Sequence, residues 1–291
     1  MNKNFEITGT TKLTCLLGDP VSHSISPAMH NASFQKLGLD YAYLAFDVDE
    51  EHFERAVDGL ITLGASGWNC TMPLKRRMYE RVDTLSDSAL LSGAVNTVVN
   101  RDGQLFGDNT DGYGFLQSMR DAGFSCKGAH AVMLGSGGAA AAILAQAALD
   151  GTDTIDIFSR KGASSTRLIA EETERIRGKS NCRIRLFDLA DTQTLKSCLN
   201  DAQILIHTSS VGMAPHTDAS LIPDASFFHP GLVVGDVIYN PRETLLLRQA
   251  REAGCHTFNG MYMLLHQGAK AFERWTGREM PVEYIRELYF R

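Results

Sequence analysis

The sequence predicts an α/β protein of two domains, with a doubly wound parallel sheet in the second. Three observations support this prediction. The chain has 291 residues, 44% of them hydrophobic and 21% charged, an ordinary globular composition at a length that suits two domains. Strand-like and helix-like segments alternate along most of the chain, as they do in parallel sheets with helical crossovers. Near the middle, a glycine-rich turn joins an apolar strand to a helix.

The first half supplies the elements of one α/β domain. A helix is predicted from Pro27 to Leu37, because proline suits the first helical turn. Residues 50–64 space their apolar side chains as a helix does. Strands are predicted at residues 13–18, 41–48 and 67–73, the last running into a loop.

A hairpin marks the end of the first domain. Arg101-Asp102-Gly103 joins two strand-like segments, and Asp-Gly is a strong hairpin signal. A helix at 86–91 precedes the hairpin, and a helix at 114–122 leaves the domain. We therefore expect residues 1–113, completed by C-terminal helices at 262–291, to form one α/β domain, and residues 114–261 to form the other.

The second domain opens with its most specific motif. Gly135-Ser136-Gly137-Gly138-Ala139-Ala140 follows the apolar strand 131–134 and begins an alanine-rich helix, so it has the G-x-G-x-x-A form of a dinucleotide fingerprint. The glycines permit a tight turn and a close approach to a pyrophosphate, and the helix N-terminus offers N–H groups to the phosphates. The alternative is a glycine-rich turn that binds nothing. Further strands predicted at 152–160, 182–189, 202–209 and 232–239 complete a Rossmann-type sheet.

The end of the second strand of this sheet bears on cofactor choice. A carboxylate there would bind the ribose hydroxyls of NAD, and basic residues would favour the 2′-phosphate of NADP. Asp156 has nearly the right spacing but precedes the strand end by two or three residues. Arg160 and Lys161 lie at the strand end, and Arg167 could also reach the phosphate. The alternative for these cations is a solvated basic turn.

Charge and hydropathy exclude other classes of protein. The formal net charge is −6, and the densest basic cluster is the short run Lys75-Arg76-Arg77, so we expect no nucleic-acid surface. We find no apolar run of about 18 residues, as a membrane span requires, and no signal-peptide pattern at the N-terminus. We expect a cytoplasmic protein.

The cysteines and histidines do not predict a metal site. The six cysteines form no C-x-x-C pair, so we expect reduced thiols. His23 and His30 lack a third ligand at suitable spacing.

Several segments together resemble the shikimate dehydrogenase family. In chain order they are Ser22–His30, Asn69–Lys75, Gly93–Thr97, Gly107–Gly112, Thr208–Met213 and Gly260–Ala269, with the dinucleotide fingerprint between the fourth and fifth. The resemblance implies reversible oxidation of shikimate to 3-dehydroshikimate with hydride transfer to NADP, a step of chorismate and aromatic amino-acid biosynthesis. The C-terminal third is most similar to the quinate/shikimate branch. The alternative is therefore a quinate/shikimate dehydrogenase of broader specificity that uses NAD.

The resemblance also implies that residues 1–113 form a substrate-binding domain and residues 114–261 a dinucleotide-binding domain, and it implies a set of site residues. The catalytic pair would be Lys75 and Asp111. The substrate would be held by these two together with Ser24, Ser26, Thr71, Asn96, Tyr239 and Gln267. The cofactor would be held by Asp87, Gly135, Ser136, Gly137, Gly138, Ala139, Ser159, Arg160, Lys161, Val237 and Gly260.

The residue types suit this chemistry. Oxidation of a carbinol needs a group that takes the hydroxyl proton, and a lysine can do so when apolar surroundings lower its pKa. Asp111 could bond the same hydroxyl and orient Lys75. Without the resemblance, Lys75 would be interpreted as a surface lysine, Asp111 as a turn residue, and Ser26 as a helix N-cap.

Two further interpretations stay open. A regulator that binds the cofactor without turnover is the competing class, but it would need neither Lys75 nor Asp111. The oligomeric state, monomer or homodimer, does not follow from the sequence.

Overall fold

The chain divides into two compact units, each an α/β structure. The computed structural model describes residues 6–290. The first unit comprises the residues up to Thr110 and those from Gln267 onward, and the second comprises Asp111–His266. Our expected boundaries, 113/114 and 261/262, fall within the helices α5 (Asp111–Asp121) and α10 (Met261–Thr276).

The first unit is built on a mixed six-stranded sheet in the order β2-β1-β3-β5-β6-β4. Strand β1 pairs in parallel with β2 and β3, whereas β5 runs antiparallel to β3 and β6. The turn between β5 and β6 holds Asp102 and Gly103 at positive φ, as the predicted hairpin requires. The strands are β1 (Lys12–Gly18), β2 (Tyr41–Asp47), β3 (Gly67–Cys70), β4 (Thr84–Leu85), β5 (Thr97–Arg101) and β6 (Gln104–Asp108).

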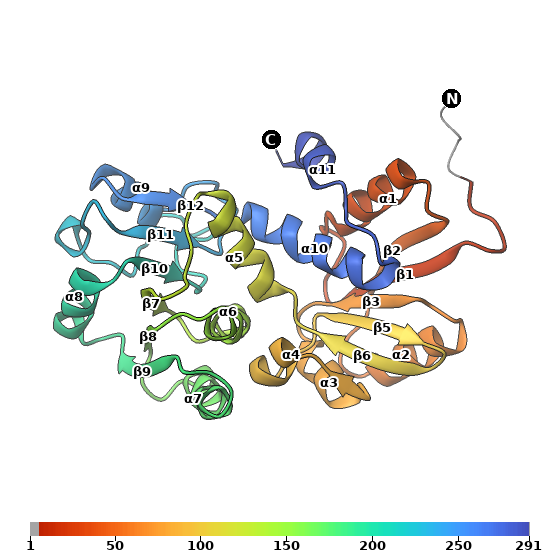
Figure 1. Ribbon diagram of the computed structural model, residues 1–291, viewed down its shortest axis with the longest axis horizontal. Coiled ribbons are helices and arrows are strands. Elements are labelled where there is room, and N and C mark those ends of the chain that lie inside the picture. Colours follow the sequence, from red (N-terminus) through yellow and green to blue (C-terminus); the bar gives the residue numbers. More distant parts are fainter. Residues whose placement is uncertain (1–5, 291) are drawn as a thin grey trace. The chain divides into compact units, whose positions relative to one another are not determined.

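Helices from both ends of the chain belong to this unit (Figure 1). Trp275 in the second half of α10 donates from Nε1 to the Val98 carbonyl at 2.8 Å, and α11 contacts α1. The C-terminal helices therefore complete the first unit's packing, although their sequence is far from its strands. The remaining helices are α1 (Ser26–Leu37), α2 (Phe53–Thr62), α3 (Lys75–Arg81), α4 (Asp87–Ser92) and α11 (Val282–Tyr289).

The second unit is a six-stranded, fully parallel sheet in the order β12-β11-β10-β7-β8-β9. The Rossmann-type sheet predicted from the sequence is thus confirmed, and the direction of winding reverses between β7 and β10. The strands are β7 (His130–Leu134), β8 (Thr154–Ser159), β9 (Arg183–Asp188), β10 (Ile204–His207), β11 (Val233–Asp236) and β12 (His256–Phe258).

Helices cover the strands of the second unit (Figure 1). A methyl group on Gly112 of α5 would collide with the Ala142 carbonyl of α6, so glycine is needed where these two helices meet. Phe158, Leu205 and Val234 lie in the largely aliphatic core. The helices are α5, α6 (Gly138–Leu149), α7 (Ser164–Arg177), α8 (Thr192–Asp201) and α9 (Leu245–Glu252), with a 3-10 turn η1 (Ala225–Phe227).

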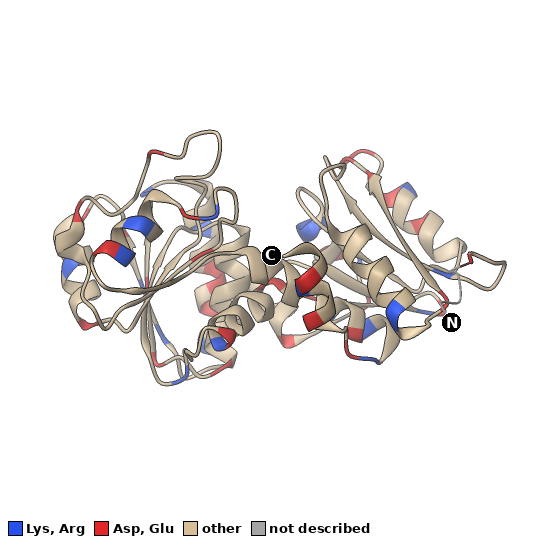
Figure 2. Ribbon diagram, turned by 90° about the horizontal axis from the view of Figure 1, so that it is seen from above, with Lys and Arg blue, Asp and Glu red and all other residues tan. Residues whose placement is uncertain are grey.

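Charged residues of both signs are spread over the described residues (Figure 2), and none of their helices could cross a membrane. Acidic and basic residues are interspersed in both units (Figure 2). Within residues 6–290, no helix is long and apolar enough to span a bilayer, and no cluster of metal-ligating side chains forms. All six cysteines are buried and unbridged, as expected for reduced thiols.

His30 lies in an aromatic cage in the core of the first unit. Its ring stacks on Tyr43 with centroids 4.4 Å apart and lies 5.2 Å from the ring of Trp275. The side chain is fully buried, and neither ring nitrogen has a hydrogen-bond partner. Burial lowers the pKa of His30 from 6.5 to about 3. The imidazole is therefore uncharged at neutral pH and packs among aromatic rings.

We predict that His30 makes the protein less stable in acid. Between pH 6.5 and about 3, the unfolded chain binds a proton at His30 that the folded chain excludes. The free energy of unfolding should therefore decrease as the pH is lowered, by up to about 1.4 kcal/mol per pH unit from this group. Urea unfolding from pH 7 to pH 5 should show a shallower loss for His30→Phe than for wild type. The exposed-residue control His216→Gln should keep the wild-type slope, and parallel curves for wild type and His30→Phe would contradict this account.

Candidate active site

Most of the site residues predicted for the first unit lie at one edge of its sheet. The parallel strands β1 and β3 end there, and the register pairs Leu17 with Cys70. The antiparallel strand β5 begins at the same edge, because Asn69 pairs with Thr97, and β6 ends there, because Thr97 pairs with Asp108. The segments that follow or precede these strand ends contain Ser24, Ser26, Thr71, Lys75 and Asn96.

The Thr71–Lys75 segment is held tightly against the end of β1. The Thr71 N–H donates to the Leu17 carbonyl at 2.9 Å, and the Asp19 N–H donates to the Met72 carbonyl at 3.1 Å. A Cβ on Gly18 would collide with the Thr71 methyl, so a larger residue at that strand end would displace the Thr71 side chain. These contacts hold the start of the segment against the end of β1.

Lys75 is the first residue of α3 and is half-buried. The sequence had not predicted this helix, and its burial distinguishes Lys75 from the exposed Arg76 beside it. Burial raises the pKa of the neighbouring Cys70 thiol to about 12, and the charge of Lys75 acts in the opposite direction. The ammonium group therefore lies close to a buried, largely apolar part of the unit.

Asn96 is fixed by a buried network. Its Oδ1 accepts the Thr110 N–H at 2.9 Å and the Thr97 hydroxyl at 2.9 Å, and its Nδ2 donates to Thr110 Oγ1 at 3.0 Å. Asn69 donates from Nδ2 to the Asn96 carbonyl and to Thr97 Oγ1, both at 3.0 Å. These bonds orient the Asn96 amide and also fix Thr110, which directly precedes Asp111.

Tyr43 extends this network, because its hydroxyl donates to Asn69 Oδ1 at 2.8 Å. The serines of the 22–26 loop precede and begin helix α1. The interpretation of Ser26 as an N-cap is wrong, because the helix begins at Ser26 and Ile25 occupies the cap position without a side-chain bond. Ser24 Oγ instead accepts the Ser26 N–H at 3.2 Å.

The sequence analysis did not identify the buried carboxylate of Asp108. Asp108 accepts from the hydroxyls of Ser86 and Ser88 at 2.6 and 2.8 Å, and from Arg274 Nε at 2.7 Å. These bonds anchor the start of α4, whose first residue is the predicted cofactor residue Asp87. Arg274 lies 166 positions along the chain from Asp108, so local sequence patterns could not have identified the pair.

The glycine-rich loop of the second unit has the geometry that its motif predicts. Gly135 has a φ of +115°, and its N–H donates to the Phe158 carbonyl at 2.9 Å. Gly137 is the N-cap of α6, and a Cβ on Gly137 or Gly138 would have no heavy atom within 4 Å. The N-terminus of α6 therefore faces open space that suits a phosphate group. Ser136 bonds through Oγ to Ser165 Oγ at 2.9 Å, and Ala139 lies in the first turn of the helix.

The end of β8 presents cations and no free carboxylate. Ser159 is the last residue of the strand, and Arg160 and Lys161 follow it with exposed side chains. The Asp156 carboxylate is not available to ribose hydroxyls, because it is buried within the sheet. It binds Arg185 through two contacts of 2.6 Å and His130 at 2.7 Å. Hydrogen bonds from Arg185 and His130 lower the pKa of Asp156 despite burial, which by itself raises it.

Val237, Tyr239 and Gly260 lie at the carboxyl ends of β11 and β12. The Val237 N–H donates to the His207 carbonyl at 3.0 Å, and the Gly260 N–H donates to the Ile238 carbonyl at 3.1 Å. A side chain on Gly260 would collide with the Val237 backbone. Tyr239 follows with 43% of its surface exposed. These residues flank the carboxyl edge of the sheet, where ligands bind in folds of this kind.

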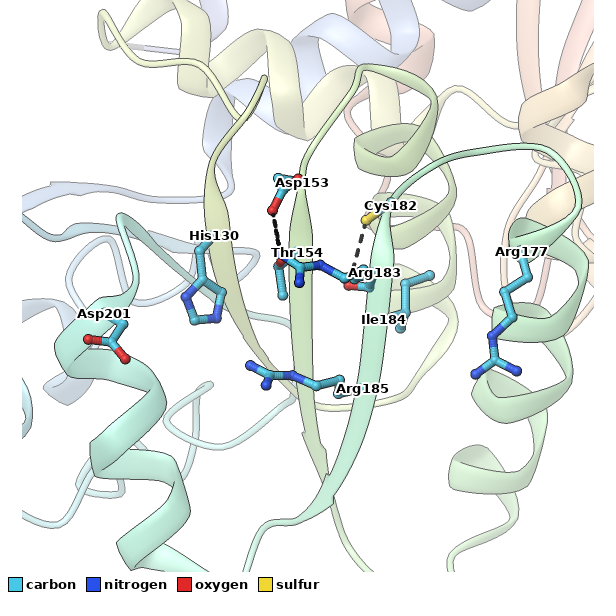
Figure 3. Close-up of a pocket in the computed structure, with 9 residues that line it drawn as sticks. All are labelled: His130, Asp153, Thr154, Arg177, Cys182, Arg183, Ile184, Arg185 and Asp201. Atoms are coloured by element: carbon cyan, nitrogen blue, oxygen red, sulfur yellow. Dashed lines mark hydrogen bonds and ion pairs between the residues drawn. The ribbon is translucent and has the colours of Figure 1, made fainter.

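A cavity of about 530 Å³ lies at the opposite edge of this sheet (Figure 3). It is lined by the starts of β7, β8 and β9, including His130, Thr154 and Arg183. Its arginines are paired with carboxylates, for example Arg183 with Asp153 at 3.0 Å. The cavity therefore lies at the amino ends of the strands, away from the glycine loop, and each of its arginines has a carboxylate partner.

Comparisons with known proteins agree with the motif set. Residues 16–98 match the shikimate dehydrogenase substrate binding domain, and residues 260–288 match the shikimate 5′-dehydrogenase C-terminal domain. The chain is 47% identical to the shikimate dehydrogenase (NADP(+)) of Listeria innocua over 98% of this chain and 97% of that protein. It is 42% identical to a quinate/shikimate dehydrogenase of Escherichia coli, over 97% and 98%.

A solved structure is also closely similar. The shikimate 5-dehydrogenase of Listeria monocytogenes, in complex with shikimate and NAD, superposes with a TM-score of 0.94 at 45% identity. The match covers 97% of this chain and 98% of that protein.

We predict that Gly137→Ala separates cofactor binding from folding. The added methyl meets no protein atom, so the stability of the ligand-free protein should be unchanged, but the methyl should obstruct a pyrophosphate. The Kd for NADP should rise about tenfold or more, equivalent to about 1.4 kcal/mol. Gly135→Ala is the matched comparison, since its positive φ and its contact with Thr208 should destabilise the fold by about 1–3 kcal/mol. Unchanged NADP affinity in Gly137→Ala would exclude the loop as the phosphate site.

Proposed function

The chain belongs to the shikimate dehydrogenase family, and we propose that it reversibly oxidises the 3-hydroxyl of shikimate to 3-dehydroshikimate with NADP as hydride acceptor. The first unit would bind shikimate and the second unit the dinucleotide. The observation that carries the proposal is the fixed constellation at the carboxyl edge of β1 and β3, where Lys75, Thr71 and Asn96 each occur at the position that the family motifs require.

In this proposal Lys75 exchanges the proton of the reacting hydroxyl. Its position at the start of α3 beside the buried Cys70 gives a partly desolvated setting, in which proton transfer by an amine is effective. Asp111, the other member of the proposed catalytic pair, hydrogen-bonds the same hydroxyl.

The substrate is a small polyol carboxylate, and the remaining residues bind its polar groups. Ser24, Ser26 and Thr71 offer hydroxyls that donate to a carboxylate or bond to ring hydroxyls. Asn96, held by its buried network, presents a preoriented amide, which reduces the entropy lost on binding. Gln267 and Tyr239 complete the predicted set.

The second unit fits the dinucleotide that the reaction requires. When bound, the nicotinamide accepts a hydride from the carbinol carbon of the substrate. The residues that would hold the dinucleotide are Gly135–Ala139 at the pyrophosphate, Ser159, Arg160 and Lys161 at the adenosine ribose, and Asp87, Val237 and Gly260 near the nicotinamide.

We assign NADP as the preferred cofactor. The carboxylate of Asp156 is engaged inside the sheet, which leaves the exposed Arg160 and Lys161 to meet the ribose. A guanidinium binds a phosphate with two hydrogen bonds and can stack on adenine. NAD is the alternative, because the related enzyme of Listeria monocytogenes was crystallised with NAD. Quinate is the corresponding alternative substrate, given the similarity to the Escherichia coli quinate/shikimate dehydrogenase.

Two cellular properties complete the proposal. The six buried, unbridged thiols suit the reducing cytoplasm. There the enzyme would supply the biosynthesis of chorismate and the aromatic amino acids, as a monomer or a homodimer.

We predict that Lys75→Ala lowers kcat by about 10²-fold or more, the scale for loss of a general acid–base group. The KM for shikimate should change much less. Arg76→Ala is the matched control, because Arg76 is the next residue of α3 and is exposed, and it should keep wild-type turnover. Steady-state assays of both purified variants, with their melting temperatures, make the comparison. A folded Lys75→Ala enzyme with near wild-type kcat would remove Lys75 from the mechanism.

We also predict that kcat/KM is higher with NADP than with NAD, and that Arg160→Ala reduces this preference. The loss should fall on the KM for NADP, since NAD lacks the 2′-phosphate that Arg160 would bind. Arg177→Ala, at the other end of α7, should leave the preference unchanged. An NAD preference greater than about tenfold, about 1.4 kcal/mol, would show that the basic turn is only solvated surface. An NADP preference that survives Arg160→Ala would shift the assignment to Lys161 or Arg167.

A further inference from the structure

Three side chains linked by hydrogen bonds lie at the point where the second sheet reverses its winding. His207 is the last residue of β10, and its side chain is 1% exposed. Its Nδ1 is 3.0 Å from Asp236 Oδ1, and its Nε2 is 2.6 Å from Ser209 Oγ. None of these three residues belongs to the set that the family motifs assign to substrate or cofactor.

The buried carboxylate of Asp236 determines the direction of its bond to His207. Asp236 is fully buried, and its Oδ1 also accepts the Ile238 N–H at 2.9 Å while its Oδ2 accepts the Thr244 hydroxyl at 2.8 Å. Because a carboxylate only accepts, His207 donates from Nδ1 to Asp236, and in the neutral imidazole Nε2 then accepts the hydroxyl of Ser209. Ser209 Oγ in turn accepts the Val211 N–H at 3.2 Å.

These three side chains have the Asp-His-Ser connectivity of a serine hydrolase, but the Ser209 hydroxyl has a different role here. Ser209 Oγ donates to His207 and accepts from Val211, so it closes a turn in the segment 208–211. The result is a clamp that joins this segment to the end of β11 and, through Thr244, to the start of α9.

The clamped segment touches the glycine loop. An ideal Cβ on Gly135 would lie 2.7 Å from Thr208 Oγ1 and 3.2 Å from the Ser209 nitrogen. The Thr208 hydroxyl donates to the Leu134 carbonyl at 2.9 Å, one residue before that glycine. A shift of residues 208–209 would therefore move the wall of the crevice between β7 and β10, which is where dinucleotides bind in doubly wound sheets.

We propose that His207 is a positioning residue for the cofactor site. Through Asp236 on one side and Ser209 on the other, it fixes residues 208–211 against Gly135 and so sets the shape of the dinucleotide crevice. The inference rests on the proposed function, because it takes the carboxyl edge of β7 and β10 as the NADP site.

The test is a double-mutant cycle on the Kd for NADPH, measured by fluorescence titration without substrate. Asn in place of His207 keeps a nitrogen near the position of Nδ1, so His207→Asn retains the bond to Asp236 and loses the bond to Ser209. Ser209→Ala loses the same bond from the other side. Each variant should raise the Kd about fivefold or more, and the double variant should raise it no further, because the residues act through one bond.

Two controls separate positioning from general destabilisation. Ser210→Ala, at the exposed neighbouring residue, should bind NADPH as wild type does. In all variants the KM for shikimate should stay within about twofold at saturating NADP, because neither His207 nor Ser209 is assigned to substrate binding. Ser209→Ala keeps the buried His207–Asp236 pair, so it provides a folded variant even if changes at His207 lower stability.

The outcomes are distinct. Wild-type Kd values in His207→Asn and Ser209→Ala, or losses that add in the double variant, would overturn the clamp while leaving the proposed function standing. A wild-type protein that binds no NADPH would overturn the proposed function and the clamp together. Weaker NADPH binding, non-additive and with an unchanged KM for shikimate, is the expected result.

Discussion

The close approach of backbone to backbone at Gly135 is the constraint on which the second unit's site depends. This residue turns the chain from β7 into α6 at a φ of +115°, with Thr208 and Ser209 against it and the Phe158 carbonyl bonded to its N–H. Three strands of the sheet thus meet at one residue. Only glycine fits, because a side chain would require both a strained backbone and displacement of the neighbouring segment. The chain then enters α6, whose open N-terminus is the site that we propose for the pyrophosphate.

In the first unit, side-chain hydrogen bonds rather than a glycine contact fix the residues at the sheet edge. Its sheet is mixed, so the edge that carries Thr71 and Lys75 also receives the start of β5 and the end of β6. Buried polar groups are stable there only when they are bonded to one another. The network through Asn69, Thr97 and Asn96 meets that requirement, and it also orients the amide that the substrate would meet.

Local signals in the sequence predicted much of this arrangement, and longer-range contacts account for what they missed. The glycine fingerprint and the Asp102-Gly103 turn need only a few neighbouring residues to be recognised. The helix at Lys75 was missed because only Met78 among its residues is fully buried, so no apolar period reveals it. The Asp108–Arg274 pair joins distant segments. Asp156 has the spacing of a ribose ligand, but its role is decided by Arg185 on the adjacent strand.

The measurement that tests the central claim most directly is the steady-state rate of NADP reduction by the purified wild-type protein, with shikimate and with quinate as separate substrates. The account predicts saturable, shikimate-dependent NADPH formation, with a kcat/KM for shikimate above that for quinate. Absence of shikimate-dependent reduction of either NADP or NAD by folded protein would contradict it.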